Sequence, residues 1–327
     1  MTFSGSNFAL IGAAGYIAPR HMQAIKATGN RVVAAMDPND SVGVIDSYFP
    51  DSAFFVEFER FDRHIDKLKR RGDGSAVDYV AICSPNYLHD SHIRFALKAG
   101  AHAICEKPLV VNPWNAEALK DIEAESGKKV NTILQLRLHP SIIALRERVA
   151  AAVAANPTAK FAVDLTYITS RGAWYFASWK GAETKSGGIA ANIGVHFFDM
   201  LLWVFGPVVS QEVDRLDWDA GSGTLVFANA EVRWFLSVNA DHLPDGVKAK
   251  GQRTYRSITM DGDEIEFSDG FTDLHTESYR HIMKGEGFGL DDALPAIHLV
   301  HDIRTAQQSG STSPSHPFAD DRQTAAG

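Results

Sequence analysis

The first 135 residues alternate between short apolar runs and longer stretches that mix apolar and polar positions. An apolar run at 8–11 is broken by Gly12 and Gly15, and a helical stretch follows at 17–28. Further buried strands are predicted at 32–36, 77–83, 101–105 and 130–134, and helices at 89–98 and 113–125. Because strands that alternate with helices form parallel sheets, this pattern predicts an α/β domain over residues 1–135.

The second half carries more strands and fewer helices between them. Strands are predicted at 161–169, 225–227, 232–238, 258–260 and 264–267, with an Asp261-Gly262 hairpin turn before the last, and helices at 193–205, 273–284 and 291–308. This mixture predicts an α+β domain with an open, largely antiparallel sheet over 136–310. The tail at 311–327, rich in Ser, Thr, Pro and Asp, is predicted to be irregular.

Composition and charge fit two ordinary folded domains. Of the 327 residues, 45% are hydrophobic and 22% charged, and the net charge of -8 argues against nucleic-acid or membrane binding, which needs a basic face. No apolar run reaches about 18 residues, and the N-terminus does not resemble a signal peptide. The two cysteines, Cys83 and Cys105, each end a predicted buried strand, as reduced thiols often do. We therefore expect a cytoplasmic protein.

The glycine-containing turn at 12–18 lies between a strand and a helix N-terminus, where a dinucleotide pyrophosphate binds. It matches the G-x-G-x-x-G/A pattern incompletely in two registers, one with Ala13, Gly15 and Ala18 and the other with Gly12, Ala14 and Ile17. The second strand ends at Asp37, whose carboxylate can accept hydrogen bonds from ribose hydroxyls and repel a 2′-phosphate. This combination favours NAD over NADP, although the sequence from Asp37 to Asp40 is also typical of a plain turn.

Polar segments follow both cysteines, at strand ends where open α/β sheets bind their ligands. Ser84-Pro85-Asn86-Tyr87-Leu88-His89 follows the first cysteine, and Glu106-Lys107-Pro108 follows the second. Pro108 favours an extended backbone at Lys107, so that the ammonium group can project over the sheet edge.

A third polar group lies in an apolar helical stretch. Helical spacing places Asn192, His196 and Asp199 on one face. A lone histidine in such a helix is more often a core residue, but the two polar neighbours make a functional role equally plausible.

Together these segments resemble the glucose–fructose oxidoreductase/inositol dehydrogenase family. The motifs are Gly-x-Ile-Ala-x-x-His at 15–21, Ser-Pro-Asn-x-x-His at 84–89, Glu-Lys-Pro at 106–108 and Asn-x-Gly-x-His-x-x-Asp at 192–199. Longer runs, such as Ile104-Cys-Glu-Lys-Pro-Leu109 and Leu165-Thr-Tyr-Ile-Thr-Ser-Arg171, are similar to one branch of the family. That branch oxidises the 3-hydroxyl of UDP-N-acetyl-glucosaminuronate to a 3-keto sugar for lipopolysaccharide biosynthesis.

The resemblance implies a Rossmann domain that binds NAD and an open C-terminal sheet that packs subunits into homodimers or homotetramers. The implied cofactor-binding residues are Gly12, Ala14, Gly15, Tyr16, Ile17, Asp37, Ser84, Pro85, Asn86, His89, Glu106, Lys107 and Gln135. The implied catalytic residues are Lys107 and His196. Alcohol oxidation needs a base, which His196 can supply, while Lys107 can stabilise the charge that develops on the oxygen.

The chain departs from many family members by carrying Asn192 where they carry Asp. An amide can orient a hydroxyl group but cannot accept its proton, which favours His196 as the base. Asp199 could orient His196 from behind, although a helix cap or a solvent contact is an equally good interpretation.

A uronate and a diphosphate both require cations. The guanidinium groups of the candidate residues would meet carboxylate or phosphate, and their aromatic rings would meet nicotinamide or uracil. The candidate substrate-binding residues are Lys107, Arg137, Arg171, Trp174, Trp179, Lys180, Lys185, Asn192 and His196. Each cation could also be a solvated surface residue.

Two other readings of the sequence are weaker. His89 and His92 have helical spacing, but no nearby Cys or acidic pair completes a zinc site, so no metal is predicted. The apolar positions of 291–308 predict a core stripe and not a partner-binding helix.

Three functions remain in competition at this stage. The leading hypothesis is the NAD-dependent nucleotide-sugar 3-dehydrogenase, with 2-oxoglutarate as a possible second substrate that reoxidises NADH. The alternatives are a dehydrogenase of a free sugar or inositol, and a non-catalytic NAD-binding regulator.

Overall fold

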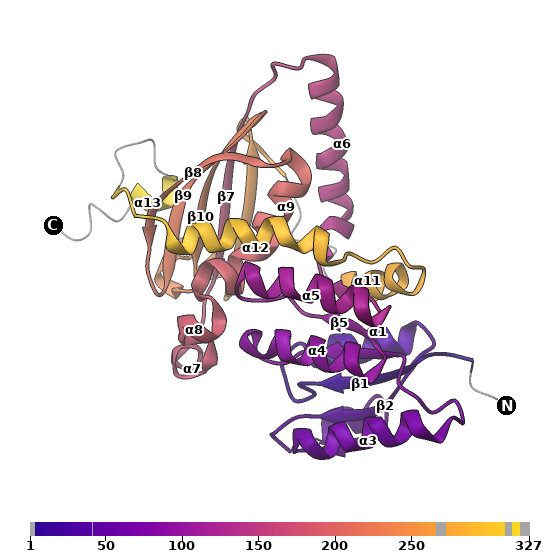
Figure 1. Ribbon diagram of the computed structural model, residues 1–327. Coiled ribbons are helices and arrows are strands. Elements are labelled where there is room, and N and C mark those ends of the chain that lie inside the picture. The colour runs from indigo at the N-terminus through magenta and orange to yellow at the C-terminus, as the bar shows by residue number, and fades with distance from the viewer. Residues whose placement is uncertain (1–3, 41, 266–272, 311–315, 321–327) are drawn as a thin grey trace. The chain divides into compact units, whose positions relative to one another are not determined.

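The computed structural model describes residues 4–40, 42–265, 273–310 and 316–320 (Figure 1). Contacts divide the chain into two units, one of Met1–Gln135 with Asp273–Leu294 and one of Leu136–Thr272 with Pro295–Gly327. Residues 273–294, which the sequence pattern assigns to the second half, thus group with the first unit.

The first unit is built on a parallel six-stranded sheet with the order β3-β2-β1-β4-β5-β6. The strands are β1 (Asn7–Ile11), β2 (Arg31–Met36), β3 (Ala53–Phe55), β4 (Tyr79–Ile82), β5 (His102–Cys105) and β6 (Val130–Thr132). The helices are α1 (Ala18–Ala27), α2 (Val42–Asp46), α3 (Phe58–Arg71), α4 (His89–Ala99), α5 (Pro113–Ser126) and α11 (Leu274–Met283). All five residues of β1 are buried, as expected for a strand covered on both faces.

The second unit is built on a mixed six-stranded sheet with the order β12-β11-β7-β10-β9-β8. Among the described strand pairs of this sheet, β7 and β10 are parallel and the others are antiparallel. Its strands are β7 (Phe161–Thr169), β8 (Val208–Leu216), β9 (Ala220–Phe227), β10 (Ala230–Ser237), β11 (Thr254–Met260) and β12 (Asp263–Glu264). Its helices are α6 (Pro140–Ala155), α7 (Ala173–Ala177), α8 (Glu183–Ser186), α9 (Val195–Phe205), α10 (Asp245–Ala249) and α13 (Pro317–Asp320), and α12 (Leu290–Thr305) spans the division between the units.

The predicted fold class is confirmed, with a Rossmann-like sheet followed by a largely antiparallel one. Several elements are not predicted by the sequence pattern, among them β3, α3, α6 and β8. β8 was missed because most of its residues are exposed or half-buried, so that no apolar run marks it. Residues 266–267 of the predicted last strand and most of the predicted tail lie outside the described residues, and α13 is a short helix within that tail.

The core of the second unit lies between its sheet and helices α6, α9 and α12, with Trp234 and Phe198 fully buried and their rings in edge-to-face contact. The described residues include one stretch, Glu183–Phe205, that is long and apolar enough to cross a membrane. Its apolar window is 72% buried within the fold, which is the pattern of a core helix in a soluble protein.

The thiols of Cys83 and Cys105 are free and buried. Burial raises the pKa of both thiols well above the ordinary value, so they are packed as neutral groups in the core.

Candidate functional site

Gly12 shapes the turn between β1 and α1. Its φ is 84°, and a Cβ atom there would lie 2.6 Å from the carbonyl carbon of Cys83, so no other residue fits without displacing backbone. The backbone N–H groups of Tyr16 and Ile17, just before α1, donate to no other group among the described residues. The turn therefore offers free donors and a helix N-terminus to an anionic group such as a pyrophosphate.

Asp37 connects the end of β2 to this turn. Its carboxylate accepts the N–H of Ala14 at 2.9 Å through Oδ2 and the N–H of Asn39 at 2.9 Å through Oδ1. The side chain is 5% exposed. Since a carboxylate can accept about four hydrogen bonds, Asp37 keeps acceptor capacity for ribose hydroxyls while it holds the turn in place.

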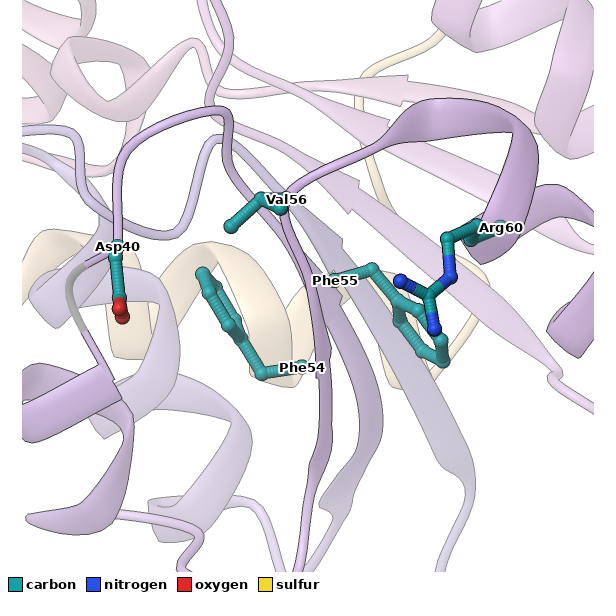
Figure 2. A pocket seen from close by; sticks show the side chains of 5 residues that line it. All are labelled: Asp40, Phe54, Phe55, Val56 and Arg60. Carbon is teal, nitrogen blue, oxygen red and sulfur yellow. The ribbon is translucent and has the colours of Figure 1, made fainter.

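A cavity of about 360 Å³ lies at the end of β3, lined by Asp40, Phe54, Phe55, Val56 and Arg60 (Figure 2). Figure 2 shows Phe54 and Val56 on the side of the strand that faces Asp40, with Phe55 and Arg60 on the other side. This cavity is not predicted by the sequence pattern, because a strand of only three residues leaves too short an apolar run to mark it. Its aromatic walls suit a flat heterocycle.

The segment after β4 is held by buried histidines. The ring nitrogens of His89 lie 2.8 Å from the carbonyl oxygens of Ser84 and Pro108, and Nδ1 of His92 lies 2.8 Å from Ser84 Oγ. His89 is fully buried. The ring thereby joins the loops that follow β4 and β5, and its direct contact with the cofactor stays a prediction.

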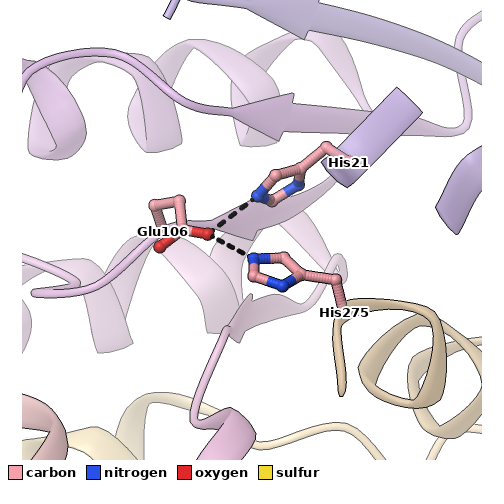
Figure 3. A group of neighbouring side chains, drawn as sticks. All are labelled: His21, Glu106 and His275. Atoms are coloured by element: carbon pink, nitrogen blue, oxygen red, sulfur yellow. Dashed lines mark hydrogen bonds and ion pairs between the residues drawn. The ribbon is translucent and has the colours of Figure 1, made fainter. Parts of the chain in front are cut away.

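Glu106 also points away from the surface. Its Oε1 lies 2.9 Å from Nε2 of His21 and 2.9 Å from Nε2 of His275, and all three side chains are buried (Figure 3). These residues could offer one ligand atom each to a metal ion, but the short separations are those of hydrogen bonds that satisfy the carboxylate. The contact of Glu106 with the cofactor stays a prediction beside this internal network. His21 belongs to a motif noted in the sequence, but nothing in the pattern connected it with His275.

The residues around His196 depart from a regular helix. Ala190–Gly194 forms a π-helical turn directly before α9, so Asn192 and His196 do not follow the regular helical spacing expected from the sequence. Nδ2 of Asn192 donates to the hydroxyl of Tyr175 at 2.6 Å. Burial raises the pKa of that tyrosine, which keeps the hydroxyl neutral. Asn192 is thereby held in one orientation by a residue that the sequence analysis did not select.

Arg137 and Asp199 form a buried ion pair. Nε and Nη2 of the guanidinium donate to the two carboxylate oxygens at 3.0 and 2.7 Å, with side-chain exposures of 8% and 2%. The structure pairs the two with each other, because a bidentate fork satisfies both charges where water has little access. The sequence-based roles, Asp199 behind His196 or in a helix cap or solvent contact and Arg137 at the substrate anion, stay predictions.

The loop after β7 carries the remaining cationic candidates. Arg171, Trp174 and Lys185 are exposed, and the ammonium group of Lys180 lies 4.1 Å from the centre of the Trp179 ring. Lys107 and Gln135 lie in the first unit, and Asn192 and His196 in the second. Oε1 of Gln135 is buried and accepts no hydrogen bond from the described residues, so it could receive a donor from a ligand.

Curated relatives match parts of the chain. D-glucoside 3-dehydrogenase of Escherichia coli is 32% identical over 180 residues, which cover 48% of this chain and 50% of that protein. Inositol 2-dehydrogenase of Leifsonia xyli is 30% identical over 209 residues, which cover 62% of this chain and 55% of that protein. The chain thus spans about half the length of these curated relatives.

A solved structure matches nearly the whole chain. The WlbA (WbpB) dehydrogenase from Thermus thermophilus, solved with NAD and UDP-GlcNAcA and also with NAD and alpha-ketoglutarate, is 49% identical. The match covers 96% of this chain and 99% of that one, with a TM-score of 0.90. Residues 6–133 match the oxidoreductase family's NAD-binding Rossmann fold, and residues 158–253 match its C-terminal alpha/beta domain. The chain therefore belongs to the GFO/IDH/MocA family of oxidoreductases, and its cofactor is NAD.

Proposed function

We propose that the protein uses NAD to oxidise the 3-hydroxyl of UDP-N-acetyl-glucosaminuronate to the 3-keto sugar. The observation that carries this proposal is the 49% identity, over 96% of the chain, to a dehydrogenase solved with NAD and UDP-GlcNAcA. The curated relatives, at 30–32% identity over parts of the chain, make a free sugar or inositol the second candidate.

The first unit fits the proposed site for NAD. The turn at Gly12 and Gly15 would receive the pyrophosphate, Asp37 the adenosine ribose, and the cavity at Phe54 the adenine. The free acceptor of Gln135 suits a carboxamide N–H. When bound, NAD supplies the hydride acceptor that oxidation of a secondary alcohol requires.

His196 and Lys107 would act on the reacting hydroxyl. His196 would accept the O–H proton as the C3 hydrogen leaves with its electron pair for the hydride acceptor and the C=O bond forms. Lys107 would hold the oxygen and stabilise its developing negative charge. Asn192, fixed by Tyr175, would orient the sugar without taking a proton.

The loop after β7 would recognise the anionic parts of the substrate. Arg171, Lys180 and Lys185 would meet the uronate carboxylate and the diphosphate, and Trp174 and Trp179 offer faces for stacking. Arg137 is left out of this set because its guanidinium is buried against Asp199. An acidic protein with a net charge of -8 needs such a local concentration of cations to bind an anion.

A second substrate would complete the cycle. The related dehydrogenase solved with NAD and alpha-ketoglutarate supports 2-oxoglutarate as the acceptor that reoxidises NADH. We further propose that the enzyme works in the cytoplasm, as a homodimer or homotetramer, in lipopolysaccharide biosynthesis.

Steady-state kinetics with a panel of sugars test the proposal. With NAD and 2-oxoglutarate present, kcat/KM for UDP-N-acetyl-glucosaminuronate should exceed that for UDP-N-acetyl-glucosamine, which lacks the carboxylate, by roughly 10- to 10²-fold, because the cations of the loop then lose a charge-assisted hydrogen bond. A higher kcat/KM for inositol or a free glucoside would favour the second candidate. NAD binding without turnover of any sugar would favour a non-catalytic regulator.

A further inference from the structure

Glu106, His21, His275 and Tyr279 form a buried hydrogen-bonded network, named here the Glu106 network. Figure 3 shows the two imidazole rings converging on one carboxylate oxygen. Oε1 of Glu106 lies 2.9 Å from Nε2 of each histidine, and Oε2 accepts the backbone N–H of Lys107 at 3.2 Å. Three donors therefore converge on one carboxylate, from α1, from α11 and from the residue that follows it.

The protons of this network can be assigned from its geometry. An ionised carboxylate only accepts, so Nε2 of each histidine must donate to Glu106. Nδ1 of His21 lies 2.8 Å from the hydroxyl of Tyr279, which then donates to it. Burial opposes ionisation of Glu106, but the hydrogen bonds from His21 and His275 outweigh it and hold the pKa of this carboxyl well below its usual range. Burial lowers the pKa of His21 and keeps that ring neutral.

Such a network is a poor way to gain stability. A buried charge costs several kcal/mol in desolvation, and apolar replacements of buried ion pairs are often neutral or stabilising. The Glu106 network instead connects α1, the end of β5 and α11, all within the first unit. Among the contacts described for it, the hydrogen bond to the backbone of Lys107 links the Glu106 network to a proposed catalytic residue.

We infer that Glu106 is a positioning residue, whose buried carboxylate, held by His21 and His275, fixes the backbone from which the Lys107 side chain reaches the substrate. This inference rests on the proposed function, because Lys107 is taken to contact the reacting oxygen. It assigns Glu106 to the support of the lysine and not to the binding of the cofactor.

The variant Glu106→Gln tests this inference. Glutamine has nearly the same shape, but its amide has one oxygen and one NH₂ group, so it cannot accept from three donors arranged around two oxygens. The matched control is Glu123→Gln, because Glu123 also accepts a backbone N–H, that of Val130 at 2.8 Å, without joining the Glu106 network.

Four quantities are measured for wild type and both variants: the Kd for NAD by calorimetry, kcat and KM with whichever sugar the wild type oxidises, the melting temperature, and the histidine ¹⁵N NMR spectrum. For Glu106→Gln we expect kcat to fall on the order of 10²-fold, as a misplaced group can cause. The Kd for NAD and the KM for the sugar should stay within about threefold of wild type. The ¹⁵N signals of His21 should change from those of the Nε2–H tautomer expected in wild type, whereas Glu123→Gln should leave kcat and the His21 and His275 signals unchanged.

Other results would overturn the inference. A Kd for NAD raised tenfold or more, with kcat unchanged at saturating NAD, would make Glu106 a cofactor ligand. A lower melting temperature with kcat per folded molecule unchanged would make the Glu106 network merely structural, and one zinc ion per chain in the purified protein would make it a metal site. A wild type that oxidises an uncharged sugar would refute the proposed substrate alone, since the kcat ratio measured with that sugar still decides the role of Glu106.

Discussion

Breaking the ion pair between Arg137 and Asp199 should destabilise the second unit without a specific effect on substrate binding. Both side chains are almost fully buried, and the guanidinium fork meets both carboxylate oxygens at 2.7–3.0 Å. Replacing one partner removes the opposing charge of this pair while the other side chain stays buried, which costs about 3–5 kcal/mol. For a domain of this size each kcal/mol lowers the melting temperature by roughly 2–4 °C. We therefore expect Arg137→Met and Asp199→Leu each to melt about 6–20 °C below wild type.

A double-mutant cycle separates this pairing from the loss of ordinary packing. The double variant Arg137→Met/Asp199→Leu should lose less free energy of unfolding than the two single variants combined, with a coupling of roughly 2–3 kcal/mol, because it buries no lone charge. Urea denaturation of the four proteins provides the free energies. Single variants that each lost under 1 kcal/mol, or a larger rise in KM for Arg137→Met than for Asp199→Leu, would refute the reasoning and return Arg137 to the substrate site.

Three further predictions concern the turn, the π-helical segment and a buried histidine. Gly12→Ala should lose roughly 2–4 kcal/mol of stability and bind NAD more weakly, since its Cβ meets backbone at 2.6 Å. The control Gly29→Ala, with φ of 75° but open space around it, should lose only about 1 kcal/mol. Calorimetry measures the stability and the NAD affinity of both variants. Tyr175→Phe removes the 2.6 Å hydrogen bond to Asn192, so it should raise the KM for the sugar several-fold and lower the free energy of unfolding by about 1 kcal/mol. An unchanged KM would exclude a positioning role for the tyrosine. Burial lowers the pKa of His92 from 6.5 to about 4, so between these pH values the ring is protonated in the unfolded chain but not in the folded one. The folded state therefore loses up to about 3 kcal/mol of stability as the pH falls from about 6.5 to 4. His92→Gln should make the free energy of unfolding depend less on pH over that range, and an unchanged slope in urea titrations would contradict the assignment.

The sequence predicted the fold class and the cofactor well because both depend on local patterns. Apolar runs that end at Gly12, Asp37 and Cys83 mark parallel strands and a turn, and the motifs around Lys107 and His196 identify the family. These signals lie within a few residues of one another, so they can be read without knowing how the chain folds.

The partners of individual side chains could not be predicted in the same way. Glu106 meets His275 across 169 positions of sequence, and Arg137 meets Asp199 across 62. Such pairings are created by the packing of distant elements, and no local pattern encodes them. Close packing also surrounds the end of the π-helical turn at Ala190–Gly194, where a Cβ on Gly194 would lie 2.7 Å from the side chains of Leu236 and Phe198.

The central claim is that the protein transfers hydride from a uronate-bearing nucleotide sugar to NAD. The most direct test is the absorbance of the reduced nicotinamide at about 340 nm. The purified protein with NAD is mixed first with UDP-N-acetyl-glucosaminuronate and then with 2-oxoglutarate, beside His196→Asn as the inactive control. The account predicts a rise of about one equivalent per site followed by a fall, and no rise in the control. A flat trace from wild-type protein that binds NAD would contradict the claim.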